Sequence, residues 1–523
     1  AGAGVSAVAP SSLPGWYALN AFIAEALSMR VERVLGRSDP TRDILSLVAT
    51  QRTAGAFPPD YQAQILEEEC GTDYFAALTS LDVDTANPVH QHIARLAGSG
   101  RVSALMTTNF DRLLERTLDA EGVRHRVAYD PNTYATCLKD LRSGMSSALW
   151  VVKIHGCATV PSSMIDTLKQ RLLGRSHDLL EIIRLFLERH HWLYAGFSAD
   201  DLESDESYLG LIAAAPVSPG LTYLRWIGSH GLRPGAQKLV DAYRSKESVL
   251  AVELPDFFAS LSAALCLSTD TLSQGSDEET VVQVKRGLEH WATSLPEATA
   301  VNCLATIAEA AGQPRAAFEL LHWYWKDVAP DMRSGAPFSR FRAHHGRLGV
   351  GAGLLSLAHR SMTERVEESL QNLLRIQKED VRGAAWAALA FLWAGRVDMA
   401  KPCLASVSAS MDGDLPREVQ VDLWLASAEA LWVLGEWEAV LKTTMLALRK
   451  AQEAGDIVRQ ARVAGIALLH AAEIGQDVFE ACLKKVSPAL KLAARVNDPQ
   501  STAFVELAYG RGLVKQRAGQ VAI

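Results

Sequence analysis

The sequence lacks paired cysteines. Its seven cysteines stand at least 20 positions apart, so it contains no C-x-x-C string. That spacing excludes a zinc ribbon of the usual paired-cysteine type. It is also typical of reduced thiols rather than of a disulfide framework. We therefore expect no zinc or other metal ligands in this chain, and we expect a cytoplasmic location.

Long apolar runs and blocks of basic residues are missing as well. No run of 18 or more apolar residues occurs, which is the length that spans a bilayer, so we expect no membrane contact. The net charge of −8, without a Lys/Arg block, argues against a dedicated nucleic-acid-binding protein. The remaining composition, with 48% hydrophobic and 21% charged residues among 523, predicts a globular chain of about two to four domains.

Short apolar runs alternate with helical patterns between residues 101 and 265. Runs without polar alternation, separated by helices, predict a parallel sheet that is covered on both faces. We predict an α/β fold with a Rossmann-like sheet and a helical insertion over about 17–100. The predicted strands lie at 102–107, 148–154, 191–197, 221–227 and 249–254, and the predicted helices include 41–51, 60–78, 88–96, 111–121, 164–174, 179–190 and 235–245.

No strand pattern survives in the C-terminal half, where glycines recur instead. Gly395, Gly435 and Gly475 are spaced 40 residues apart, and each stands between two helical patterns. Helical hairpins at a fixed period predict an α-solenoid. Residues 424–448 resemble a tetratricopeptide repeat, although 40 residues is longer than the usual unit of that family.

These patterns set the predicted domain boundaries. An N-terminal α/β domain spans 1–266, a polar linker spans 267–280, and a helical-repeat domain spans 281–523. The chain opens on Ala1 inside a glycine-rich string, without the apolar strand that such a turn normally follows, so we expect residues upstream of it. The basic string at 340–347 predicts a solvent-facing loop.

Four short strings stand where predicted strands end or where the chain opens. They are GAGVS at 2–6, TTNFD at 107–111, KIHG at 153–156 and GFS at 196–198. Open parallel sheets bind ligands at the carboxyl ends of their strands, so these strings predict a nucleotide site. Glycines in the first string would let backbone approach a pyrophosphate, while Ser6 adds a hydroxyl; the alternative is an ordinary strand-to-helix turn.

The polar side chains in these strings are the candidates for chemistry, and each has a simpler interpretation. Asn109 offers an amide that both donates and accepts. Asp111 suits the N-cap of the helix that follows it equally well. His155 could act as a general base near neutral pH, or it could be a structural hydrogen-bonding residue. Asp200, in an acidic run after Ser198, could contact ribose hydroxyls, or belong to a solvated loop.

In this order, the GAG-x-S, T-x-N-x-D and HG strings resemble the sirtuin family, and within it the bacterial NAD-hydrolysing sirtuin-like domains. The resemblance covers about residues 1–265 and implies NAD as the substrate. It implies that Asn109 and Asp111 hold the nicotinamide-side ribose and a water, and that His155 is the catalytic histidine. The residues that it implies for NAD binding are Gly2, Ala3, Gly4, Ser6, Thr108, Gly156, Gly196, Ser198 and Asp200.

Two departures from the family narrow the implied activity. The chain has SSLPGW at 11–16 where family deacylases carry an aspartate–phenylalanine–arginine string, and it lacks their four zinc-binding cysteines. The resemblance then implies an NAD glycohydrolase that yields nicotinamide and ADP-ribose, regulated as an effector of antiphage defence. Its repeats would sense an invader protein or nucleic acid, or dock a partner subunit or a second copy of the chain. The alternatives are an NAD-sensing binding module within a larger complex and a zinc-free protein deacylase.

Overall fold

The structure is a computed structural model of the chain. It describes residues 1–36, 38–53, 59–144, 148–172, 174–199, 202, 215, 217–243, 246–270, 276–328, 341, 344, 345, 348, 381–393, 396–410, 415, 417–496, 502, 503 and 505–511. Two residues named above, Asp200 and Gly395, lie outside this part of the chain.

The chain divides into two compact units. The first comprises Ala1–Ile23 and Gly71–Trp291, and the second comprises Ala24–Cys70 and Ala292–Ile523. Residues 24–70 therefore group with the C-terminal helices, whereas the sequence assigned them to an insertion in the N-terminal domain. The predicted domain boundaries stay a prediction. Two helices contain residues of both units: α2 (Trp16–Leu35) and α15 (Asp277–Ser294).

The first unit is built on two parallel three-stranded sheets, ordered β1-β3-β2 and β4-β5-β6. This Rossmann-like parallel arrangement with surrounding helices confirms an α/β N-terminal region. Its strands are β1 (Ala104–Thr107), β2 (His125–Ala128), β3 (Leu149–Lys153), β4 (Trp192–Tyr194), β5 (Leu221–Trp226) and β6 (Glu247–Val252). Its helices are α1 (Ala3–Ser6), α5 (Asp73–Leu78), η1 (Thr79–Leu81), α6 (Pro88–Gly98), α7 (Leu113–Ala120), α8 (Pro131–Ser143), η2 (Pro161–Ser163), α9 (Leu168–Leu172), α10 (His177–Arg189), α13 (Pro234–Ala242) and α14 (Leu254–Ala264).

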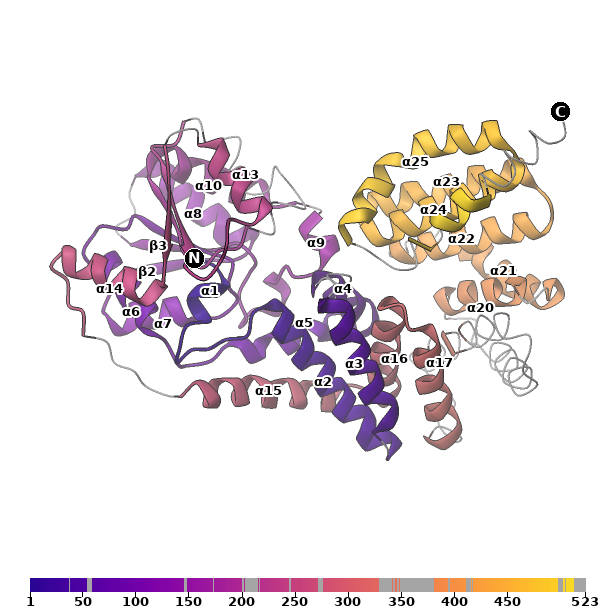
Figure 1. Ribbon diagram of the computed structural model, residues 1–523, viewed down its shortest axis with the longest axis horizontal. Helices are drawn as coiled ribbons and strands as arrows, with labels where there is room; N and C mark the ends of the chain where they lie inside the picture. The colour runs from indigo at the N-terminus through magenta and orange to yellow at the C-terminus, as the bar shows by residue number, and fades with distance from the viewer. Residues whose placement is uncertain are drawn as a thin grey trace. The chain divides into compact units, whose positions relative to one another are not determined.

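The central strand β3 is buried on both faces. Trp150 and Val152 pack into a core with Ile182 of α10, while Val151 packs with Leu118 of α7 in a different core. Figure 1 shows α8, α10 and α13 on one side of the strands and α6, α7 and α14 on the other. This two-sided burial explains the uninterrupted apolar run of β3, because neither face meets water.

The first two residues join the two sheets. The amine of Ala1 donates to the carbonyl of Met106 in β1 at 2.6 Å, and the N–H of Gly2 donates to the carbonyl of Ala195, just after β4, at 3.0 Å. A cavity of about 500 Å³ opens beside Ala1, and residues of β1 and β4 line it. The glycine-rich string therefore begins between β1 and β4.

Every regular element among the described residues of the second unit is a helix. Adjacent helices pack in sequence, α20 on α21, α22 on α23 and α24 on α25, and α23 also packs on α24. This supports a helical C-terminal region, while the solenoid stays a prediction. The helices are α3 (Asp39–Thr53), α4 (Pro59–Cys70), α16 (Glu297–Ala310), α17 (Pro314–Trp323), the π-helix η4 (Tyr324–Val328), α20 (Val381–Trp393), α21 (Val397–Ser410), α22 (Arg417–Val433), α23 (Trp437–Glu453), α24 (Ile457–Ile474) and α25 (Gln476–Val496).

Three local predictions were wrong. The helix expected at 60–78 is two helices, α4 and α5, because Gly71 adopts a left-handed φ of +62° between them. The strand β2 was missed, since it is an edge strand with the charged Arg126 in it. His344 and His345, expected in a solvent-facing loop, are helical and at most 1% exposed.

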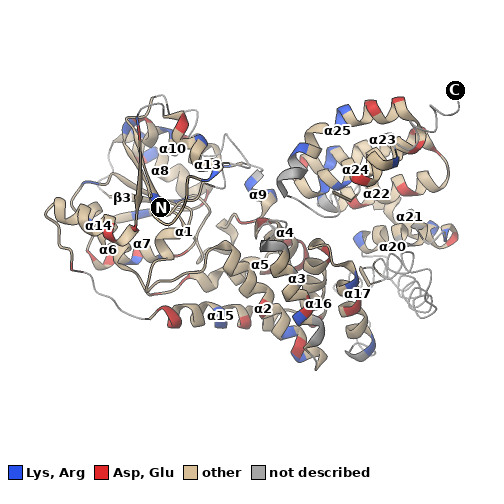
Figure 2. Cartoon of the chain, in the orientation of Figure 1, with Lys and Arg blue, Asp and Glu red and all other residues tan. Residues whose placement is uncertain are grey.

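No described helix is long and apolar enough to cross a membrane. Within the same residues, no cluster of three or more His, Cys, Asp or Glu side chains has an arrangement that could hold a metal ion. Figure 2 shows acidic and basic residues interspersed along the described helices.

Candidate functional site

Strand register brings Asn109 and His155 to the same edge of the first sheet. Thr107 of β1 pairs with Lys153 of β3, and the two strands run parallel. Asn109 stands two residues after Thr107, and His155 stands two residues after Lys153. Both therefore lie just beyond the carboxyl ends of their strands, at the same edge of the sheet. The sequence prediction that both stand at strand ends agrees with this geometry, while their chemical roles stay a prediction.

The hydroxyl of Ser6 is the centre of a hydrogen-bond network that joins three segments. Ser6 Oγ donates to Asp111 Oδ2 at 3.0 Å and accepts from Asn109 Nδ2 at 3.0 Å. His90 Nε2 lies 3.2 Å from the same oxygen. The Asn87 N–H donates to His90 Nδ1 at 3.3 Å, so the ring proton is on Nε2 and points to Ser6. One donor and two acceptor positions of this hydroxyl are thus all used.

The same network fixes the direction of the Asn109 side chain. Its Nδ2 donates both to Ser6 Oγ and to the carbonyl of Gly2, at 3.0 and 3.3 Å. Both of these oxygens can accept here, since the Ser6 proton goes to Asp111, so the amide nitrogen must face them. The carbonyl oxygen of Asn109 consequently faces the other way and can accept a hydrogen bond from a ligand.

His90 and Asn87 belong to this site, and the sequence analysis missed both. Asn87 caps α6, and its Nδ2 donates to the carbonyls of Val5 and Val8 at 2.8 and 3.0 Å. Burial lowers the pKa of His90 to about 3, so its ring stays neutral at pH 7. The Asn-Pro pair at 87–88 signals a helix start, but nothing in the sequence shows that α6 docks on α1.

A buried ion pair supports the TTNFD turn from below. Lys153 is fully buried, and its Nζ lies 2.9 Å from Glu115 Oε1 and donates to the carbonyl of Asp111. The Asp111 carboxylate accepts from the N–H of Leu113 at 3.1 Å, where α7 begins. Asp111 therefore combines the helix-start contact with its bond to Ser6. Lys153 is a charged residue at the end of the apolar strand β3, and the sequence prediction made no use of this feature.

The glycines of two strings are explained by contact between their own backbones. A Cβ on Gly4 would lie 2.8 Å from the Cα of Gly196, and a Cβ on Gly2 would lie 2.5 Å from the carbonyl oxygen of Gly196. Gly196 has a left-handed φ of +61° and no room for a side chain. The N–H groups of Gly2 and Gly4 donate to Ala195 and Gly196. In this conformation, those two N–H groups are therefore already engaged.

The cavity at Asn109 is small, about 40 Å³, which is room for roughly one water molecule. Ser6, Thr108, Asn109 and Asp111 line it together with Ala3, and apolar side chains including Leu13, Trp16, Leu81 and Phe110 close it. His155 is 1% exposed and is not among its described lining residues. Phe110 packs against Trp16 and against the ring of His155, with centroids 5.4 and 6.4 Å apart. The geometry does not bring His155 and Asn109 to one open cavity.

Gly156 and Ser198 are two further residues that the sequence predicted for NAD binding. Gly156, next to His155, has a left-handed φ of +90° and is buried against the backbone of Ser163. Ser198 is exposed, and it follows the Gly196 turn. Gly156 follows β3 and Ser198 follows β4, so both lie beyond the carboxyl ends of parallel strands.

Comparison with protein families points to the same segment. Residues 103–219 match the family model described as SIR2-like domain. The match includes Asn109, Asp111 and His155, and it begins after the GAGVS string. SIR2-like domains are generally NAD-dependent enzymes, so an NAD-related activity fits this part of the chain. No curated protein matches the sequence.

Proposed function

We propose that the first unit is an NAD glycohydrolase, which cleaves the nicotinamide–ribose bond with water and releases nicotinamide and ADP-ribose. The fixed orientation of Asn109 carries the proposal, because it leaves an amide oxygen directed away from its own partners at the carboxyl edge of the sheet. The SIR2-like match over the same residues supports NAD as the substrate.

The chemistry makes modest demands on the protein. Nicotinamide leaves a cationic ring as a neutral molecule, so no general acid is required, and the ribose passes through an oxocarbenium-like state. Asn109 Oδ1 would accept a hydrogen bond from a ribose hydroxyl or from the attacking water. The carboxylate of Asp111 would supply negative potential near the cation, and His155 would take the proton.

A dinucleotide requires the described cavity to open. Leu13 and Trp16 lie on the segment that follows α1, and Phe110 packs between Trp16 and His155. We propose that this segment and Phe110 move together, which exposes His155 and enlarges the cavity beside Asn109. A closed resting state suits an enzyme whose unrestrained activity would deplete NAD in its own cell.

A closed resting state also suggests a biological role in which the activity is released only on demand. The protein would act as an effector of antiphage defence, with the helical C-terminal region as its sensor. An invader protein, a nucleic acid or a partner subunit, including a second copy of the chain, would release the activity. The resemblance of the four strings to bacterial sirtuin-like effectors supports this step.

The test is NAD turnover by the purified full-length chain, followed by chromatography of nicotinamide and ADP-ribose. We expect Asn109→Ala and His155→Ala to lower the rate by on the order of 100-fold or more. Asn132→Ala, at an exposed position on α8, serves as the matched control and should leave the rate unchanged. Equal rates in all four proteins would remove the assignment. NAD binding without cleavage would favour a sensing module instead, and nicotinamide release only with an acyl peptide would favour a deacylase.

A further inference from the structure

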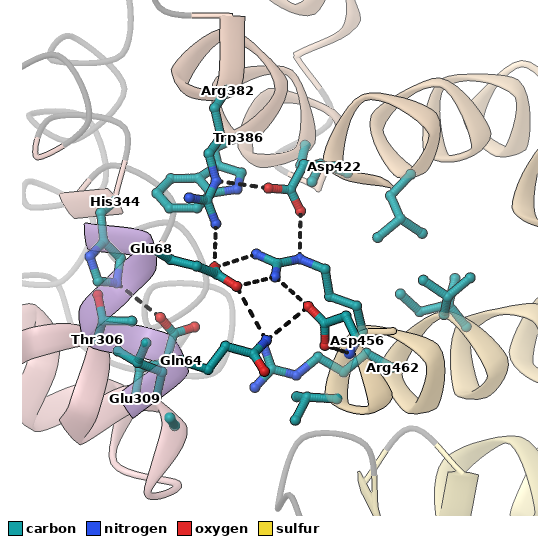
Figure 3. A pocket seen from close by; sticks show the side chains of 18 of the residues that line it. Gln64, Glu68, Thr306, Glu309, His344, Arg382, Trp386, Asp422, Asp456 and Arg462 are labelled. Atoms are coloured by element: carbon teal, nitrogen blue, oxygen red, sulfur yellow. Dashed lines mark hydrogen bonds and ion pairs between the residues drawn. The ribbon is translucent and has the colours of Figure 1, made fainter. Parts of the chain in front are cut away.

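The second unit contains a cavity that the proposed chemistry does not use. Its volume is about 390 Å³, within the range of small-molecule sites. Side chains from α4, α16, α20, α22 and α24 line it, as Figure 3 shows for the labelled residues. Segments far apart in sequence therefore build one polar cavity.

A network of ion pairs forms one wall of the cavity. Glu68 of α4 accepts from Arg459 Nη2 at 2.7 Å and from Arg382 Nη2 at 3.1 Å. Asp422 pairs with Arg382 at 2.9 Å, and Asp456 with Arg459 at 2.6 Å. Burial alone would raise the pKa of Glu68, but the two guanidinium groups hold it well below its usual range. Glu68 is therefore ionised, and the two guanidinium groups of the network are already paired with its three carboxylates.

The complete lining has an excess of negative charge. Besides three carboxylates in the network, it contains Glu69, Glu309 and Glu429, against three guanidinium groups in all. His344 lies 2.9 Å from Glu309, and a positive charge at that position would still leave the lining negative. Glu429 Oε1 lies 3.5 Å from His470 Nε2. An anionic ligand is thus disfavoured, and a cation is favoured.

Gln64 adds an independent sign that a donor is missing. Its side chain is 2% exposed and lines the cavity (Figure 3). Its Nε2 donates to Asp456 at 2.9 Å and to Glu68 at 3.3 Å, and ionised carboxylates can only accept, so the amide orientation is determined. The buried Oε1 then has no hydrogen-bond partner among the described residues. A buried acceptor of this kind calls for a donor in the cavity.

We propose that this cavity binds an organic cation, either a protonated alkylamine or an alkylguanidine. The cationic group would donate to Gln64 Oε1 and lie near Glu429, while its alkyl part packs on Leu389 and Ile466. The ring of Trp386 also lines the cavity, with the guanidinium of Arg382 already 4.8 Å from its centroid. A metal ion is a poorer occupant, since no metal-holding cluster occurs among the described residues. The source is a free amine or a Lys or Arg side chain of a peptide.

Calorimetric titration of the full-length protein with two probes distinguishes these sources. Agmatine represents the free cation, and a blocked Ala-Arg-Ala peptide represents the side chain; a blocked Ala-Glu-Ala peptide is the anionic counterpart. We expect one or both cationic probes to bind, with affinity that falls as salt is added. Glu429→Gln keeps the shape and removes one charge, and we expect about tenfold weaker binding. Glu438→Gln, on the exposed face of α23, is the matched control and should bind like the parent.

Each outcome decides the proposal. Binding of agmatine alone supports a small-molecule amine, and binding of the arginine peptide supports a side chain. The proposal fails if neither cationic probe binds the folded protein at millimolar concentration, if the glutamate peptide binds instead, or if Glu429→Gln and Glu438→Gln bind alike. Thermal unfolding of each variant confirms that the protein compared is folded. None of these readouts depends on NAD cleavage.

Discussion

The Asn109 amide donates to the Ser6 hydroxyl across 3.0 Å, although 103 positions separate the two residues in the chain. The bond joins the turn after β1 to α1, and it positions the oxygen that the proposed chemistry requires. Ser6 donates its own hydrogen bond to Asp111, so its oxygen is left to accept from Asn109.

Removal of the Ser6 hydroxyl should therefore destabilise the first unit. Ser6→Ala leaves Asn109, His90 and Asp111 without their shared partner in a buried site. We expect a loss of about 1–3 kcal/mol in the free energy of unfolding, measured by chemical denaturation. Thr136→Ala, which removes an exposed hydroxyl bond on α8, is the control and should change stability by less than about 0.5 kcal/mol. Equal effects would contradict the network.

A methyl group should not be tolerated at Gly196. Its left-handed φ of +61° disfavours any side chain, and a Cβ there would lie 2.4 Å from the N atom of Val5. We expect Gly196→Ala to cost about 2 kcal/mol or more, or to prevent soluble expression. Gly231→Ala, at an exposed glycine with open space around it, should be nearly neutral. Thermal unfolding of both proteins makes the comparison, and a stable Gly196→Ala protein would show that the two strings are not in contact.

His90 should make the first unit sensitive to acid. Burial lowers its folded-state pKa to about 3, whereas an unfolded imidazole titrates near 6.5. Between these values the unfolded chain binds one more proton than the folded chain, so stability falls as pH is lowered through that window. We expect His90→Gln to flatten the dependence of the urea midpoint on pH between about 6.5 and 4. Burial also lowers the pKa of His345 to about 3. The contribution of His345 to the pH dependence of stability is therefore still present in His90→Gln.

Cys70 and Cys303 should form a disulfide under oxidation. Their Sγ atoms lie 3.2 Å apart, at the end of α4 and within α16. Diamide would accept the two thiol hydrogens as the S–S bond forms, so thiol titration in denaturant should fall from seven to five. In Cys70→Ser, diamide treatment should no longer remove two thiols, because one thiol of the pair is gone. In Cys266→Ser, which lacks an exposed thiol instead, diamide should still remove two. An unchanged loss of two thiols in Cys70→Ser would contradict the assignment.

Most of the strand positions could be predicted from the sequence, because buried parallel strands are continuous apolar runs. β3 is the clearest example, because Leu149 to Val152 form an uninterrupted apolar run. The sequence did not predict β2, because the charged Arg126 interrupts this four-residue strand. In the structure, the Arg126 guanidinium lies over the Trp150 ring at the sheet edge, 4.7 Å from the ring centroid. A charged residue in a short strand carries no apolar signal, so only the sheet context explains it.

The sequence could place candidate residues at strand ends, but it could not indicate residues that tertiary packing brings to the candidate site, and the roles of all of them stay a prediction. Asn109 and His155 follow neighbouring strands, which sequence alone can show. His90 reaches Ser6 because α6 docks on α1, and Lys153 reaches Glu115 because α7 packs beside β3. α4 groups with the C-terminal helices, and its Glu68 contacts Arg459, 391 positions away. No local sequence pattern can indicate a contact over such a separation.

The interlocked backbones of Gly4 and Gly196 have a consequence for protein engineering. The backbones of the two turns lie so close that one added carbon atom on Gly4 or on Gly196 would clash with the other turn. Neither turn can therefore be exchanged or redesigned while the other is left in place. A graft of the loop after β4 from another protein would need residues 2–5 transplanted with it, as a single cassette.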